Sequence, residues 1–102
     1  MVDQTTSRTP VTSGDARRMI ERASALVRQG DIVAARLLLE RAGSGSDGAA
    51  LFALAETYDP NVLARLGVRG GVTADPERAR LLYQQARDVG AIGAQARINS
   101  LP

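Results

Sequence analysis

The sequence contains no cysteine, no histidine, no lysine and no tryptophan. The absence of cysteine excludes disulfide bonds, thiolate metal sites and a cysteine nucleophile. The absence of histidine removes the commonest general base and the commonest zinc ligand. Without lysine, a glycine-rich loop lacks the amine that binds phosphate in a P-loop, so we interpret "GSGSDG" (43–48) as a turn. We therefore expect no metal and no cofactor.

Aromatic residues and long apolar runs are also scarce. The chain has two tyrosines and one phenylalanine. No apolar run approaches the roughly 20 residues of a membrane span, and "MVDQTTSRTPVTSG" lacks the apolar segment of a secretory signal. We expect no membrane insertion and a cytoplasmic location for the chain as given. The net charge of +2 predicts no strong attraction to nucleic acid.

The 102 residues, 44% of them hydrophobic, fit a single folded domain. Residues 1–14 are rich in threonine and serine without an apolar period, which predicts a disordered tail or linker. Apolar residues then recur at helical spacing, and we expect a helical repeat domain over 15–102. Its parts are a hairpin over 15–42, a second unit over 47–89 with an inserted segment at 59–71, and a C-terminal capping helix over 91–101. This gives an all-α fold of about five helices.

Capping residues mark the expected ends of the helices. Expected caps are Ser13 or Asp15, Ser46 or Asp47, and Asp75, which is followed by Pro76. Glycines at 30 and 90 are expected stops. The inserted segment carries Val62, Leu63 and Leu66, which predict one helical turn packed onto the body.

Two stretches, "ARLLLERA" (35–42) and "ARLLYQQA" (79–86), are nearly the same. The offset is 44 residues, from Asp31 to Asp75, and the match continues into the following helix, where Ala50 meets Ala94 and Leu54 meets Ile98. A repeat of this length predicts an α-solenoid, in which each helical pair buries one face against the next. The shared alanines are expected where two helices cross closely.

"RQGDIVAARLLLERA" resembles the turn and second helix of a tetratricopeptide repeat, and "GVTADPERARLLYQQARDVGAIGAQ" is similar to the Sel-one-like branch. The resemblance implies a short right-handed α-solenoid of antiparallel helical hairpins that acts as a non-enzymatic protein–protein interaction scaffold. By position in the family it implies that the partner-binding groove contains Arg17, Ser24, Arg28, Phe52 and Glu56. The chain departs from the family at Arg22, at Asp47 and in the long segment between Tyr58 and Gly71.

Other functions remain open at this point. Glu56 and Asp59 are the only neighbouring carboxylates on an expected helix end, but the following Pro60 favours exposure to solvent over catalysis. The arginines at 17, 18, 22, 65 and 69 are candidates for weak nucleic-acid binding, although acidic residues are interspersed with them. The chain could also be the terminal module of a larger envelope or signalling protein. The expected partner is a protein or peptide of unknown identity, and a monomer is favoured.

Overall fold

The computed structural model describes residues 13–43, 47–67 and 72–102. Within these residues the structure is entirely helical, which confirms the all-α prediction. The helices, six in the described part of the chain, are α2 (Ser13–Arg28), α3 (Ile32–Gly43), α4 (Gly48–Glu56), α5 (Pro60–Leu66), α6 (Pro76–Asp88) and α7 (Ala94–Ser100). The additional helix relative to the expected five is α5, which replaces the single turn expected in the inserted segment.

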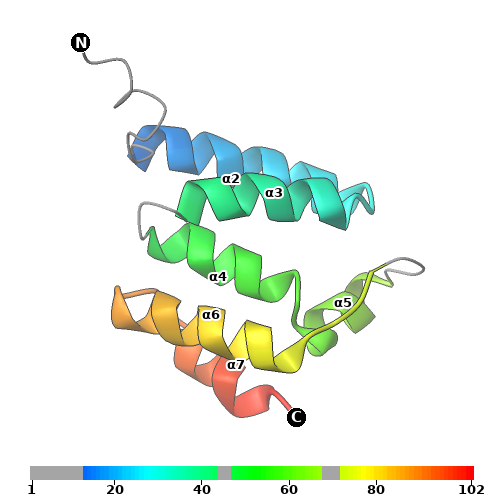
Figure 1. Ribbon diagram of the computed structural model, residues 1–102, viewed down its shortest axis with the longest axis vertical. Coiled ribbons are helices and arrows are strands. Elements are labelled where there is room, and N and C mark those ends of the chain that lie inside the picture. Colours follow the sequence, from blue (N-terminus) through cyan, green and yellow to red (C-terminus); the bar gives the residue numbers. More distant parts are fainter. Residues whose placement is uncertain (1–12, 44–46, 68–71) are drawn as a thin grey trace.

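Most helices pack against the next one along the chain. Contacts join α2 to α3, α3 to α4, α4 to α6, and α6 to α7, while α2 also contacts α4. Figure 1 shows the result as a stack with α2 at one end and α7 at the other. α5 interrupts this order. The chain before α5 and the chain that leads into α6 are joined by a 2.8 Å hydrogen bond from the backbone N–H of Asp75 to the carbonyl of Tyr58.

Aspartates cap four of the helices. Asp31 caps α3, because its side chain accepts a hydrogen bond from the N–H of Ala34 at 3.1 Å. The side chains of Asp47, Asp59 and Asp75 accept hydrogen bonds from the backbone N–H groups of Ala50, Asn61 and Arg78, at 3.0, 2.8 and 3.0 Å respectively. The predicted caps at Asp47 and Asp75 are therefore confirmed, whereas Ser46 lies outside the described residues. Gly30 and Gly90 end their helices with φ angles of 87° and 94°, as predicted.

Helix boundaries differ from the prediction at two places. α2 already begins at Ser13, so Asp15 lies in its first turn, where it pairs with Arg18. α7 begins at Ala94 and not at residue 91, because Gly90 and Gly93 both adopt positive φ angles and hold the chain in a turn between them.

The two repeats place equivalent residues in equivalent surroundings. Ala35 and Ala42 are fully buried, as are their counterparts Ala79 and Ala86, and the large residues Leu39 and Tyr83 are both buried. Outward positions match as well, since Leu37 and Leu81 are both exposed. The predicted core alanines are thus confirmed, and close helix packing explains why these positions are small.

The arginine that occurs in both repeats, Arg36 in one and Arg80 in the other, binds backbone oxygens in each. Arg36 donates hydrogen bonds to the backbone carbonyls of Thr57 and Thr73, at 2.5 and 3.2 Å. Arg80, its counterpart, donates to the backbone oxygen of Pro102, the last residue of the given sequence, at 3.2 Å. Each arginine therefore binds backbone close to the end of the helix that follows its own, α4 in one repeat and α7 in the other.

Candidate functional site

A hollow of about 420 Å³ lies between α2, α4 and α5, with a floor contributed by α3. Its wall is mostly apolar, and the exceptions are Ser24, Arg28, Glu56, Thr57 and Arg65. α5 forms one wall of this hollow. Its Val62 and Leu63 are buried, whereas its Leu66 is 46% exposed. We expected Leu66 to pack onto the body, and the structure instead leaves it at the edge of this hollow.

Three of the five predicted partner-binding residues line this hollow. Ser24 and Arg28 come from α2, and Glu56 comes from α4. A shallower hollow of about 600 Å³ beside it is lined by the fourth, Phe52, together with Ser24 and Glu56 again. Arg17 lines neither hollow and lies at a separate depression of about 270 Å³ near Asp47.

Phe52 is only partly available for binding. Its ring meets the ring of Tyr83 edge to face, with centroids 5.3 Å apart at an angle of 66°. The guanidinium carbon of Arg97 lies 4.9 Å from the Phe52 ring centroid, a distance typical of a cation–π contact. Phe52 therefore joins α4, α6 and α7 while its remaining surface lines the shallower hollow.

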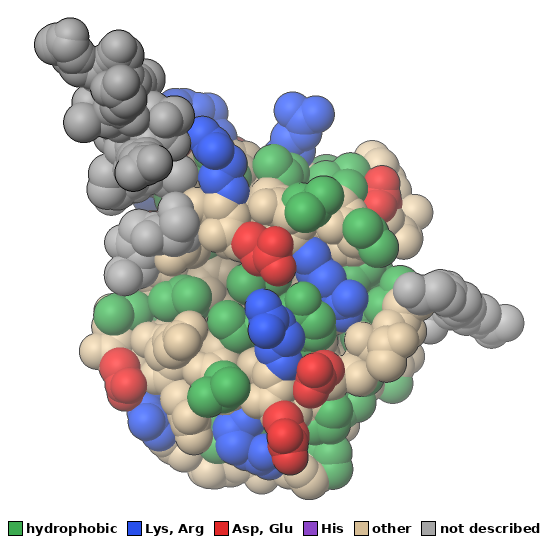
Figure 2. Space-filling view, in the orientation of Figure 1, with side chains coloured by type: hydrophobic (Ala, Val, Ile, Leu, Met, Phe, Trp, Pro, Cys, Tyr) green, Lys and Arg blue, Asp and Glu red, His purple; other side chains and the backbone are tan. Residues whose placement is uncertain are grey.

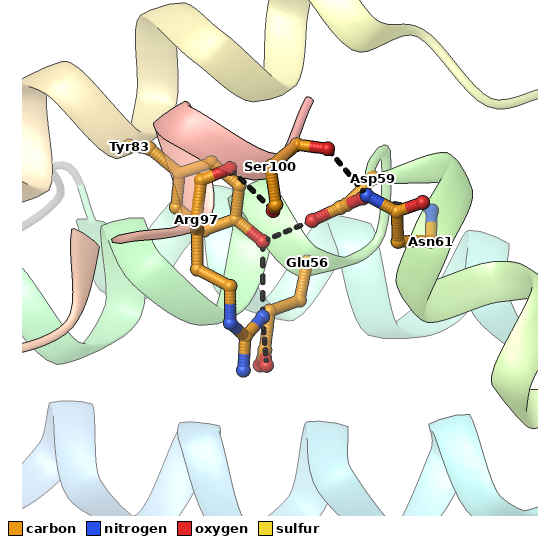
Figure 3. A network of polar contacts seen from close by, with 6 residues as sticks. All are labelled: Glu56, Asp59, Asn61, Tyr83, Arg97 and Ser100. Atoms are coloured by element: carbon orange, nitrogen blue, oxygen red, sulfur yellow. Dashed lines mark hydrogen bonds and ion pairs between the residues drawn. The ribbon is translucent and has the colours of Figure 1, made fainter. Parts of the chain in front are cut away.

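Glu56 is paired within the fold. Its carboxylate accepts from Nη1 of Arg97 at 2.9 Å, and both side chains are about one-third exposed. Because α7 supplies this cation, the negative charge of Glu56 is already balanced at the edge of the hollow. Figure 3 shows the pair beside the phenol of Tyr83.

Asp59 lies at the centre of a buried polar network. The phenol of Tyr83 donates to Oδ2 of Asp59 at 2.8 Å and accepts from Nη1 of Arg97 at 3.2 Å. Oδ1 of Asp59 caps α5 through the N–H of Asn61, whose side chain donates to the carbonyl of Ser100 at 3.0 Å (Figure 3). This network ties α5 to both α6 and α7. It therefore fixes the helix that forms one wall of the hollow.

Burial raises the pKa of the Tyr83 phenol well above its ordinary value, and the hydrogen bond to Asp59 raises it further. The Tyr83 phenol is protonated at physiological pH, as an unshifted tyrosine also is, and it donates a hydrogen bond to the Asp59 carboxylate. We call the hydrogen bond between Tyr83 and Asp59 the clamp, because it joins α6 to the start of α5 where Asp59 is fully buried.

The expected exposure of the Glu56 and Asp59 pair is wrong. Asp59 is completely buried, and Glu56 is half-buried and bound to Arg97. The reason is that α4 ends at Glu56 and Asp59 turns inward as the cap of α5. A signal was present in the sequence: Asp59–Pro60 repeats the Asp75–Pro76 pair that starts α6.

The arginines proposed for nucleic-acid binding are not brought into one cluster. Arg17, Arg18 and Arg22 are exposed on α2, and Arg18 pairs with Asp15. Arg65 lies on α5 at the hollow, and Arg69 is outside the described residues. On the face drawn in Figure 2, acidic and basic side chains are interspersed and do not form a single basic field.

In the described part of the chain, no helix is long and apolar enough to cross a membrane. The same residues contain no group of three or more acidic side chains placed to hold a metal ion. Comparisons of the chain with protein-family models, with curated proteins and with solved structures each found no match. Membership of the tetratricopeptide or Sel-one-like families therefore stays a prediction.

Proposed function

We propose that this chain is a non-enzymatic protein-interaction module that binds a segment of a partner protein along the face formed by α2 and α4. We further propose that its helices form a short right-handed α-solenoid of the tetratricopeptide or Sel-one-like kind. The equivalent burial of the repeated alanines and the equivalent contacts of Arg36 and Arg80 support this arrangement.

One observation carries the binding proposal. Ser24, Arg28 and Glu56, which come from two helices separated in the chain by α3, line the same apolar hollow. Concave, mostly apolar sites with a few polar groups at their edge are the usual form of a binding site. The hydrogen bonds that join α5 to α6 and α7 support this arrangement of the wall.

Site-specific cross-linking tests the proposal. A photoreactive amino acid placed at the exposed position Ser24 should capture a partner in the native cell, and the same group at exposed Leu37 on α3 is the matched control. We expect a product at position 24 that is absent at position 37, and whose purified partner binds the wild-type chain in calorimetry. Equal products at both positions, or a purified partner that does not bind, would contradict the proposed face.

A further inference from the structure

The hollow between α2, α4 and α5 has no unsatisfied polar group deep inside it. Thr57 is its one buried polar residue, and its hydroxyl donates to the carbonyl of Leu54 at 2.6 Å and accepts from Nε of Arg36 at 3.3 Å. Since the hydroxyl is already satisfied, a polar ligand would find no partner there and would lose its hydrogen bonds to water. The interior therefore favours apolar side chains.

The charge at the edge of the hollow is positive. Arg28 and Arg65 both line it, and across the described ranges neither side chain makes a hydrogen bond or an ion pair. The one acidic residue of the lining, Glu56, is neutralised by Arg97. Two guanidinium groups, one on α2 and one on α5, are thus left to bind an anion.

Arg65 is present at this site only because of the inserted segment. α5 brings Arg65 and the exposed side chain of Leu66 to the hollow that Arg28 of α2 also lines. Guanidinium groups bind carboxylates through two parallel hydrogen bonds, which gives both strength and geometric selectivity. The insertion therefore adds a second cation and an apolar edge to a face that α2 and α4 would otherwise form alone.

We propose that this hollow selects an acidic, amphipathic segment of a partner protein. Apolar side chains of the segment enter between α2 and α5, and its Asp or Glu side chains pair with Arg28 and Arg65. This inference rests on the proposed function and deepens it, because it names the chemistry of the partner segment. The charge complementarity at Arg28 and Arg65 carries it.

A display library of random peptides, selected on the purified full chain, tests the proposal. We expect enriched peptides to combine apolar residues with Asp or Glu. Their affinity should fall about tenfold or more for the double variant Arg28→Glu/Arg65→Glu, because two charge-assisted contacts become repulsive. The double variant Arg18→Glu/Arg22→Glu, which carries the same change in net charge at exposed positions of α2 that line none of the three hollows, should retain binding.

A second pair of variants tests the apolar edge. Leu66→Glu should abolish binding of the selected acidic peptides, whereas Leu81→Glu, at a comparably exposed position on α6, should not. Thermal unfolding of all four variants shows whether each is folded. Enriched peptides that lack acidic residues, or that bind the Arg28→Glu/Arg65→Glu variant as well as wild type, would overturn this inference and leave the proposed function standing. A library that yields no binder at all would count against the proposed function itself.

Discussion

The phenol of Tyr83 donates a 2.8 Å hydrogen bond to the carboxylate of Asp59, and both residues are completely buried. Tyr83 lies in the middle of α6, and Asp59 is the residue that starts α5. The bond therefore connects the inserted helix to the repeat framework. Because α5 forms one wall of the hollow, the shape of the candidate binding site depends on this contact.

Replacing Tyr83 with phenylalanine should destabilise the protein. The ring and its contact with Phe52 are kept, but Asp59 loses a hydrogen-bond partner in a site that water does not reach. We expect a loss of about 1–3 kcal/mol in the free energy of unfolding, measured by urea denaturation. Tyr58→Phe is the matched control, since in the described residues the Tyr58 hydroxyl makes no hydrogen bond, and it should change stability by less than about 0.5 kcal/mol. Equal losses in the two variants would contradict the role of the hydrogen bond.

The stability contributed by Tyr83 should decrease at alkaline pH. The folded-state pKa of Tyr83 is raised by burial and by Asp59, so the unfolded chain releases this proton first, near its ordinary pKa of about 10. The unfolded state binds fewer protons above that pH, and stability falls there by up to about 1.4 kcal/mol per pH unit for this group.

Comparison with Tyr83→Phe isolates this effect from the other titrating groups. The difference in unfolding free energy between wild type and Tyr83→Phe should be constant below about pH 9 and should shrink as the pH rises above 10. Urea denaturation at a series of pH values measures it. A difference that does not change with pH would show that the phenol is not shielded in the folded state.

The alanine at the crossing of α6 with its neighbours should not tolerate enlargement. Ala79 is fully buried at a position where the repeat places alanine twice. Ala79→Leu should destabilise the protein by about 1–3 kcal/mol, because the extra methylene groups push the helices apart. Ala96→Leu, at an exposed position on α7, is the control and should alter stability by less than about 0.5 kcal/mol in the same thermal or urea unfolding experiment. A larger effect at position 96 would contradict the packing argument.

Sequence periodicity was sufficient to predict most of the helices and their buried faces. The apolar spacing places Leu82 and Tyr83 inward on α6, and the Asp75–Pro76 pair marks the start of that helix. These features depend on neighbours within about four residues, so a local pattern contains the necessary information.

The clamp and the hollow could not be predicted in the same way. The local sequence around Asp59 favours exposure to solvent. Its burial depends on the hydrogen bond from Tyr83 and on its own role as the cap of α5, and only the tertiary packing brings these together. The sequence suggested only a nucleic-acid hypothesis for Arg65. Its place in the same hollow as Arg28 depends on the path of the inserted segment. Long-range placement of an insertion has no periodic signal in the sequence.

Any binding of nucleic acid should be weak and strongly dependent on salt. The exposed arginines of α2 are interspersed with acidic residues, and Arg18 is paired with Asp15. Contacts limited to phosphates release counterions, so the association constant should fall steeply as salt is raised. Fluorescence anisotropy with a labelled duplex over a range of salt concentrations measures this dependence. Arg17→Glu/Arg22→Glu should remove the residual binding, whereas Arg28→Glu/Arg65→Glu should reduce it less. Tight binding that persists at high salt would contradict the expectation, and it would move the nucleic-acid hypothesis ahead of the protein-interaction proposal.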